Sequence, residues 1–349
     1  MTSCTIGDHR GATGAHAMAA RWTHAEADIP CAVCGTREVT VVALKDRHGQ
    51  ALRSVCCRAC GLVWVDPRPD TPAIERFYAE DYRQQYKGDH RPKPKHCHRQ
   101  TLGAIERAEA LRPRLRQGLR VLDVGAGAGF FAYAMQRLGL AIDGIEPNRG
   151  YAHFAREVLG LTRVQMGFLQ GLRPAEPYDL VTIHHVFEHL PDPREAMAQL
   201  RALLAPDGRV LMEVPNIEAT YHAPNRIFHL GHLYWFNPAN LQALALQCGF
   251  AVESLRLVPR TAHIAIELRR GEVSNDPATV AALLDGNALR VASALRRHTL
   301  LAHYLGATPY RRFLRKAWQY GREQFGLRGL SDGRAICDAV CDDWLRRAR

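Results

Sequence analysis

The 349-residue sequence contains no apolar run long enough to cross a membrane, and its first 28 residues lack the basic start and apolar centre of a signal peptide. It also contains no internal repeat and no low-complexity tract, which excludes a solenoid or a fibrous protein. Lysine is scarce, because only 5 of the 46 basic residues are lysines. These absences predict a cytoplasmic globular protein in which residues 1–28 are disordered.

The positive charge is concentrated at the C-terminal end of the chain. The net charge is +11, and residues 290–349 contain 13 basic and 5 acidic residues, so the other 289 residues carry only about +3. Such a basic segment can contact a phosphate-bearing substrate, an anionic membrane surface or a partner, and a solvated basic face is the simpler alternative.

Four of the ten cysteines form two C-x-x-C-G pairs. Cys31 and Cys34 are the first pair, Cys57 and Cys60 are the second, and a β-prone stretch lies between them. Each pair can point two thiolates at one tetrahedral centre, and the glycine that follows permits the tight turn. The spacing predicts a zinc ribbon over residues 29–66, with a structural ion because four thiolates leave no position for a reactive water.

A glycine-rich loop follows a short buried strand at residues 121–124 and precedes an apolar helical pattern. Its glycines are Gly125, Gly127 and Gly129, which let the backbone approach a ligand closely. The G-x-G-x-x-G pattern of dinucleotide-binding proteins is missing, and Asp123 would repel a pyrophosphate. The loop therefore favours a ligand that carries positive charge.

This loop, D-x-G-x-G-x-G, resembles the first motif of class I S-adenosylmethionine-dependent methyltransferases. Residues 178–193, which include Tyr-Asp-Leu-Val and Glu-His-Leu-Pro-Asp-Pro, are similar to the fourth strand and its exit in the same group. Glu146 ends the second strand about 20 residues past the loop, where a carboxylate can accept hydrogen bonds from ribose hydroxyls. The resemblance implies that S-adenosylmethionine contacts Asp123, Gly125, Ala126, Gly127, Gly129, Phe130, Glu146, Pro147, Gly167, Phe168, His184 and His185.

The predicted fold class is α/β, a Rossmann-like seven-strand methyltransferase sheet with an N-terminal zinc ribbon and a C-terminal helical extension. We expect a linker or lid over residues 67–100, the methyltransferase domain over 101–270 and a basic helical module over 271–349. An aromatic helix at residues 74–86 could cover the active site, or only pack the ribbon against the core. Residues 90–98 are predicted to form a loop. Cys337 and Cys341 lie one helical turn apart, which indicates that they pack a helix against the core.

The catalytic candidates follow the ends of two predicted strands, where ligands bind in such sheets. They are His232, His189 and Glu188, and histidine suits a general base because its ordinary pKa is near neutrality. Sugar C-methyltransferases with a zinc ribbon carry Tyr-x-Glu-His at the later position, whereas this chain reads His-Leu-Gly-His and keeps only the last residue. A metal site made from these histidines is not predicted, because no ligand spacing on a single helix supports it.

The sequence thus predicts methyl transfer to the oxygen or carbon of a small molecule, such as a sugar, a glycoconjugate or a secondary metabolite, with phosphate- and nucleotide-linked molecules among the candidates. Two alternatives remain open. One is a ribosomal or transfer RNA methyltransferase, although the N-P-P-[YF] motif of base-methylating enzymes is absent after the fourth strand. The other is a methyltransferase-like scaffold without catalysis, which would have no need of the acidic residues and glycines described above.

Overall fold

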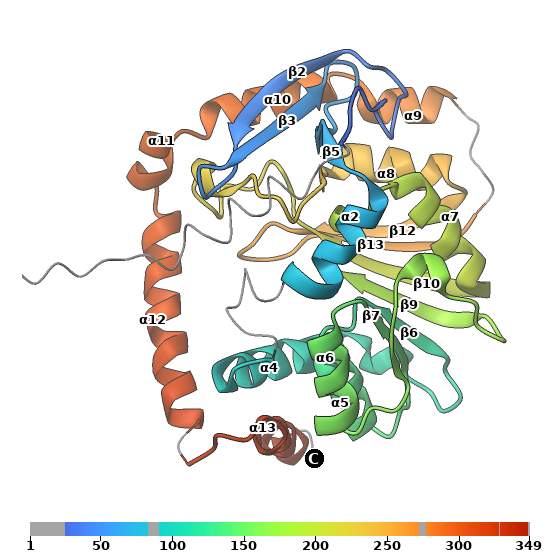
Figure 1. Ribbon diagram of the computed structural model, residues 1–349, viewed down its shortest axis with the longest axis vertical. Helices are drawn as coiled ribbons and strands as arrows, with labels where there is room; N and C mark the ends of the chain where they lie inside the picture. Colours follow the sequence, from blue (N-terminus) through green and yellow to red (C-terminus); the bar gives the residue numbers. More distant parts are fainter. Residues whose placement is uncertain (1–24, 83–90, 272–276, 328, 348–349) are drawn as a thin grey trace, which may run out of the picture.

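A seven-stranded sheet forms the centre of the molecule in the computed structural model, which describes residues 25–82, 91–271, 277–327 and 329–347 (Figure 1). The strand order is β12-β13-β10-β9-β6-β7-β8, and all neighbours from β10 to β8 are parallel. Strand β13 runs antiparallel to both of its neighbours, β10 and β12. The strands are β6 (Val121–Val124), β7 (Asp143–Glu146), β8 (Val164–Met166), β9 (Tyr178–His184), β10 (Leu204–Val214), β12 (Phe250–Leu257) and β13 (Ile264–Arg270). The predicted seven-strand sheet is confirmed.

Helices cover both faces of this sheet. The hydrophobic residues of α4, α5 and α6 form one buried cluster, and those of α7 and α8 join a second cluster with β9 and β10. The helices are α4 (Pro94–Leu111), α5 (Phe130–Arg137), α6 (Arg149–His153) with its π-helical continuation η3 (Phe154–Val158), α7 (Pro193–Leu203) and α8 (Pro238–Gln247). The parallel strands therefore end together at one edge, between two helical layers.

Helix α4 begins earlier than the sequence suggested. Residues 90–98 were expected to form a loop, but the helix starts at Pro94, so the prediction is wrong for residues 94–98, while His90 lies outside the described residues. The proline occupies the first helical turn, where its missing N–H costs nothing. Cys97 and Thr101 then continue the buried face of the helix.

The segment before α4 differs from its prediction in a similar way. The expected aromatic helix is a short helix, α2 (Thr71–Arg76), that continues as a π-helical turn, η1 (Phe77–Asp81), and Tyr86 lies outside the described residues. Further upstream, Ala25–Glu26 forms the short strand β1 against β5 (Arg68–Pro69), although these residues were expected to lack structure.

The cysteine-rich unit is joined to the central domain by a shared sheet. Strands β2 (Val39–Lys45), β3 (Ala51–Cys57) and β4 (Val63–Val65) are followed in sheet order by β11 (Tyr234–Trp235), which comes from the segment after β10. The unit also contributes to the core, because Cys31, Val33 and Cys60 are buried in the same cluster as β9 and β10.

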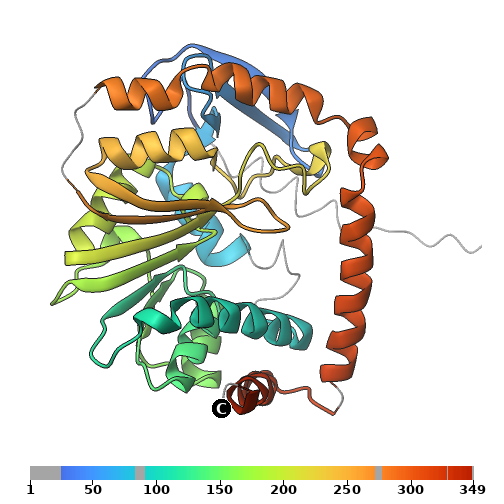
Figure 2. The same cartoon turned by 180° about the vertical axis from the view of Figure 1, so that it is seen from behind.

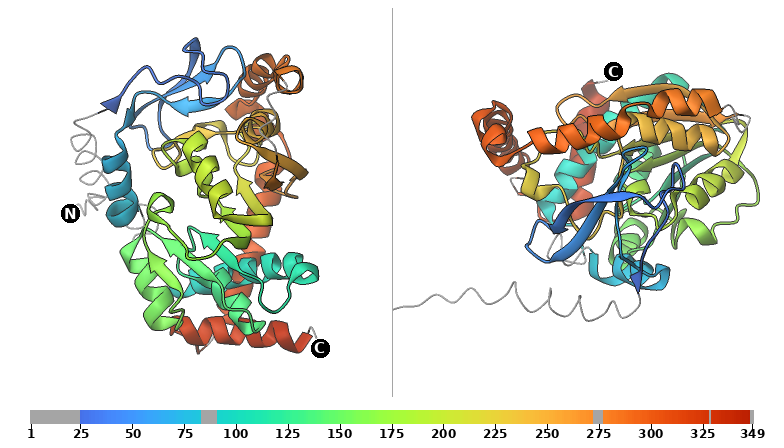
Figure 3. Two further views of the ribbon diagram at one scale, coloured as in Figure 1. Left: turned by 90° about the vertical axis from the view of Figure 1, so that its right-hand side faces the viewer. Right: turned by 90° about the horizontal axis from the view of Figure 1, so that it is seen from above.

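The C-terminal helices run along one side of the molecule, from the cysteine-rich unit to α4 (Figures 1 and 2). In α10, Asn287 donates a hydrogen bond of 2.7 Å to the carbonyl of Cys60. At the other end, α13 crosses α4 and α5 (Figure 3), and its Cys337 and Cys341 are fully buried, as the packing interpretation predicted. The helices are α9 (Pro277–Leu284), α10 (Asn287–Arg297), α11 (Leu300–Leu305), α12 (Thr308–Gly326) and α13 (Gly333–Arg347). Within the described ranges, none of the helices has both the length and the apolar character that spanning a bilayer requires.

Candidate active site

A cavity of about 530 Å³ lies at the carboxyl ends of the parallel strands. Its lining comes from the loop between β6 and α5, the ends of β7, β9 and β10, the start of α4, and the aromatic segment α2–η1. This is the position where α/β sheets bind their ligands. Residues far apart in the sequence therefore line one cavity.

The glycine loop forms one end of the cavity. Gly125, Gly127 and Gly129 all have positive φ angles, of 73°, 59° and 81°, which L-residues with side chains rarely adopt. A Cβ atom on Gly125 would also lie 2.3 Å from Val186 Cγ2. Glu146 stabilises the loop, because its Oε2 accepts a hydrogen bond of 2.8 Å from the backbone N–H of Gly127.

Asp123 is buried beneath this loop. Its Oδ1 accepts a hydrogen bond of 2.7 Å from the hydroxyl of Thr182 on β9. Burial raises the pKa of Asp123 to about 6, and the Thr182 hydrogen bond acts in the opposite direction. The carboxylate is thus costly to ionise unless a positive group binds beside it.

Most of the residues predicted to contact the cofactor lie in the cavity lining. Two do not, Gly129 and Gly167. Gly129 is the N-cap of α5, and a Cβ there would lie 2.5 Å from Leu161 Cδ1, so this glycine permits close packing inside the domain. Those in the lining are Asp123, Gly125, Ala126, Gly127, Phe130, Glu146, Pro147, Phe168, His184 and His185.

The three catalytic candidates also line the cavity and lie together. Glu188 Oε1 is 3.7 Å from His232 Nε2 and 3.9 Å from His189 Nε2. Glu188 is only 1% exposed, and burial raises its pKa to about 8. Burial also lowers the pKa of His232 well below its ordinary value, so this imidazole is neutral at physiological pH. We refer to Glu188, His189 and His232 as the EHH cluster.

A second group of polar residues adjoins the EHH cluster. Glu213, at the end of β10, has its Oε1 3.2 Å from both His185 Nε2 and His263 Nδ1. Burial alone would raise the pKa of Glu213, but the hydrogen bonds from these two histidines bring it well below its usual range. Sequence reasoning missed the roles of Glu213 and His263. The position of Glu213 at a strand end was a usable signal, whereas nothing in the sequence marked His263.

Aromatic side chains of η1 and of its C-cap residue Tyr82 line the cavity beside the EHH cluster. The Tyr78 hydroxyl lies 2.9 Å from His189 Nδ1 and donates a hydrogen bond to the carbonyl of Gly231, which His189 Nδ1 also contacts. The Tyr82 ring lies 5.8 Å from the His189 ring, measured between centroids. Asn148 holds the segment in place by donating a hydrogen bond of 3.2 Å to the carbonyl of Ala79. The predicted aromatic segment therefore lines the cavity.

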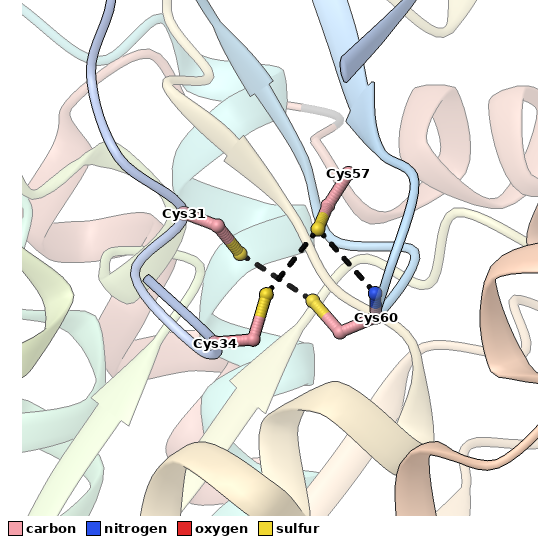
Figure 4. A group of neighbouring side chains, drawn as sticks. All are labelled: Cys31, Cys34, Cys57 and Cys60. Carbon is pink, nitrogen blue, oxygen red and sulfur yellow. Dashed lines mark hydrogen bonds between the residues drawn. The ribbon is translucent and has the colours of Figure 1, made fainter. Parts of the chain in front are cut away.

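The four cysteines of the two C-x-x-C-G pairs converge on one point (Figure 4). The Sγ atoms of Cys31 and Cys60 are 3.4 Å apart, as are those of Cys34 and Cys57, and all four lie within 4.8 Å of one another. These distances are too long for disulfides and close to those between the ligands of a tetrahedral Zn²⁺ ion. The chemistry of four convergent thiolates fits zinc.

Residues 96–255 match the family model described as a methyltransferase domain. The chain is 34% identical over 109 residues to the ubiquinone biosynthesis O-methyltransferase of Haemophilus ducreyi, covering 28% of this chain and 46% of that protein. It is 29% identical over 164 residues to the protein of the same name from Klebsiella pneumoniae, covering 44% and 64%. The chain thus spans about half to two thirds of the length of these curated relatives.

Among solved structures, the CcbJ methyltransferase from Streptomyces caelestis aligns with a TM-score of 0.41 and 17% identity, over 48% of this chain and 89% of that one. The matched residues 96–255 hold the sheet strands β6 to β10, the glycine loop and the EHH cluster. This part of the chain therefore matches a methyltransferase domain, and its loop from Asp123 to Gly129 resembles the first motif of the S-adenosylmethionine-dependent class.

Proposed function

We propose that this protein transfers a methyl group from S-adenosylmethionine to an oxygen atom of a small molecule. One observation carries the proposal: a single cavity is lined by both the glycine loop with its acidic residues and the EHH cluster. The loop supplies what the cofactor requires, and the cluster supplies polar groups for an acceptor. The relatives that are named O-methyltransferases support oxygen over carbon.

The reaction is an in-line displacement at the methyl carbon of the sulfonium. Asp123 and Glu146 would hold the cofactor, the first by attraction to its positive groups and the second through the ribose hydroxyls. An acceptor hydroxyl must lose a proton as it attacks, and we propose that the EHH cluster promotes this loss. In one version of this proposal His232 accepts the proton, as the sequence analysis suggested.

The acceptor end of the cavity suits a polar, anionic small molecule. Arg47 and Arg226 are both part of the lining. Tyr221, another lining residue, lies under the guanidinium groups of Arg312 and Arg315 from α12, at 4.7 and 5.3 Å from the ring centroid. We therefore favour an acceptor that carries a phosphate, nucleotide or carboxylate group, such as a modified sugar or secondary metabolite.

We also propose that the four convergent cysteines bind a structural zinc ion. The ion would join the two C-x-x-C-G turns, whose second turn is already tied to α10 through the carbonyl of Cys60. Because thiolates must remain reduced to bind zinc, we propose a cytoplasmic location.

The first experiment is a thermal-shift titration of the zinc-loaded protein with S-adenosylmethionine, S-adenosylhomocysteine and NAD. A ligand that binds only the native state at about 100 times its Kd adds about 2.7 kcal/mol to the stability. We expect the two adenosyl-sulfur ligands to raise the melting temperature, with no effect of NAD. Gly127→Val should abolish the shift, because the side chain would enter the cavity lining. Absence of a shift with any ligand would refute the proposal and favour a scaffold.

The acceptor is then sought by transfer of a radiolabelled methyl group. Candidate phenols, sugars and nucleotide-linked sugars are compared with total RNA. Incorporation into a small molecule supports the proposal, whereas salt-sensitive incorporation into RNA alone would replace it with the RNA alternative.

A further inference from the structure

The carboxylate of Glu188 is surrounded by imidazoles but bonded to none of them. Three histidine nitrogen atoms approach its Oε1: His232 Nε2 at 3.7 Å, His185 Nδ1 at 3.8 Å and His189 Nε2 at 3.9 Å. These distances exceed the hydrogen-bonding range. Neither oxygen of Glu188 has a hydrogen-bond partner in the part of the chain that the structure describes.

This arrangement is unusual for a buried acid. Polar groups removed from water are almost always hydrogen-bonded, and a buried carboxylate requires a positive partner or a proton. The imidazoles of His185, His189 and His232 lie too far from Glu188 Oε1 to donate a hydrogen bond to it, so they do not satisfy the carboxylate in this geometry. Imidazole nitrogen atoms and a carboxylate oxygen that converge without bonding to one another resemble a set of ligands more than an ion pair.

Neighbouring groups orient two of these imidazoles, those of His189 and His185, whereas His232 Nδ1 has no hydrogen-bond partner among the described residues. The contact between His189 Nδ1 and the carbonyl of Gly231 turns the Nε2 atom of His189 toward Glu188. His185 is held in the same manner, because its Nε2 lies 3.2 Å from Glu213 Oε1 while its Nδ1 faces Glu188. A backbone carbonyl or a carboxylate on the far nitrogen is the usual support of a histidine that binds a metal.

We propose that Glu188, His189 and His232 bind a divalent transition-metal ion in the acceptor end of the cavity. Their ligand atoms all lie within 4.8 Å of one another, and the cation would satisfy the buried carboxylate. Two imidazoles and one carboxylate suit Zn²⁺, Co²⁺, Mn²⁺ or Fe²⁺ rather than Mg²⁺ or Ca²⁺. The sequence-based rejection of a histidine metal site is thereby revised, because these ligands come from two loops and not from one helix.

The role of this ion in catalysis rests on the proposed function. An ion at the cluster lowers the pKa of an acceptor hydroxyl that reaches it. The O–H bond breaks and its proton passes to His185 Nδ1, whose other nitrogen is held by Glu213. The new O–CH₃ bond then forms as the S–CH₃ bond of S-adenosylmethionine breaks, which leaves S-adenosylhomocysteine. His232 is a ligand in this arrangement, and His185 replaces it as the base.

Cobalt is the probe that separates this site from the cysteines. The full chain is first saturated with zinc and freed of excess metal, and Co²⁺ is then titrated while the visible absorption is recorded. We expect one further equivalent to bind, with weak d–d bands and without the strong thiolate-to-cobalt absorption that a cysteine site produces. Glu188→Gln and His232→Gln should weaken this binding by more than the ~10–100-fold that loss of an outer-shell partner costs.

The matched control is His222→Gln. His222 lines the same cavity but lies outside the EHH cluster, so this variant should bind cobalt like the wild type. Three results would overturn the proposal: no bound cobalt beyond the ribbon, a thiolate-type spectrum only, or wild-type cobalt affinity in both cluster variants. S-adenosylhomocysteine binding to every variant, measured by thermal shift, shows that each is folded.

The same two measurements distinguish the failure of this inference from the failure of the proposed function. If the cofactor analogue binds and cobalt does not, the metal site is wrong and the proposed methyl transfer stands. If cobalt binds with the expected spectrum and the analogue does not, the metal site stands and the methyltransferase proposal fails.

Discussion

The buried carboxylate of Asp123 should make cofactor binding depend on pH. The positively charged ligand requires the ionised form of this residue, and the pKa of Asp123 in the free protein is raised to about 6. Below that pH the carboxyl becomes protonated, so affinity for S-adenosylmethionine should fall about tenfold for each further pH unit. Between pH 7 and pH 5 we therefore expect a loss of about tenfold.

The stability of the free protein should change in the opposite direction. The pKa of Asp123 is raised from an ordinary 3.8 to about 6, so the folded state binds this proton more tightly than the unfolded state. Above pH 6 the ionised residue costs roughly 3 kcal/mol, and this cost disappears as the pH falls through 6 toward 4. Asp123→Asn should consequently stabilise the free protein at pH 7.5 by up to about this amount, while it weakens cofactor binding.

Isothermal titration calorimetry between pH 5 and 7 tests this reasoning. Methylthioadenosine, which has no positive charge, is the control ligand and should bind with little pH dependence. Thr182→Val removes the 2.7 Å hydrogen bond that favours the ionised carboxylate, so it should move the midpoint to higher pH by about one unit. A flat affinity for S-adenosylmethionine, or the same profile for methylthioadenosine, would refute an ionised Asp123 as the electrostatic partner.

Three further predictions concern packing and the proposed zinc site. Removal of zinc by a strong chelator should lower the melting temperature of the whole protein and not only unfold the ribbon, because Cys31 and Cys60 belong to the core around β9 and β10. Separate calorimetric transitions for the ribbon and the central domain would contradict this prediction. Ile336→Ala, at a fully buried position of α13, should cost about 2–5 kcal/mol in urea denaturation, and a change under 0.5 kcal/mol would show that α13 is not docked. Phe187→Ala should lower the free energy of unfolding by about 3–5 kcal/mol, because this fully buried ring lies 5.3 Å from the Phe236 ring, measured between centroids, and fixes the turn that carries Glu188. Unchanged stability in urea would disprove that role.

The parts of the fold that are continuous in sequence could be predicted well. The strand at Val121–Val124 is a short apolar run followed by glycines, and its boundaries agree with the structure. The start of α4 was missed because Pro94 was interpreted as a loop residue, although a proline is equally suited to the first turn of a helix. A local pattern with two physical interpretations is decided by packing, here by the burial of Cys97 and the residues that follow it on the same helical face.

The pairing of β11 with β4 could not be predicted from the sequence. Tyr234–Trp235 is only two residues long, and its partner at Val63–Val65 lies about 170 residues earlier. Neither segment has an alternation that identifies the other. The consequence is functional, because this pairing places the segment with His232 beside the ribbon and above the strand ends.

The same holds for the candidate site: its features that are close in sequence could be predicted, and those that depend on the whole fold could not. The glycine loop and Glu146 are close in sequence, so the proposed cofactor end of the cavity could be outlined from their spacing. Glu188 and His189 were suggested by their position after a strand, and so was His232. The sequence could not show that these three side chains meet, because His232 lies on a separate loop and the distance between loops is set by the whole fold.

Asp123 and Glu188 together suggest that the cavity binds two positive groups at separate positions. Both are buried carboxylates with raised pKa values, one under the glycine loop and one in the EHH cluster. A protein selected for stability alone would replace such residues with apolar ones, since each lowers the stability of the empty fold. Binding of a positive group offsets each cost. For Asp123 we propose that this group is the cofactor, and for Glu188, which lacks even the single hydroxyl partner that Asp123 has, we propose the metal ion of the EHH cluster.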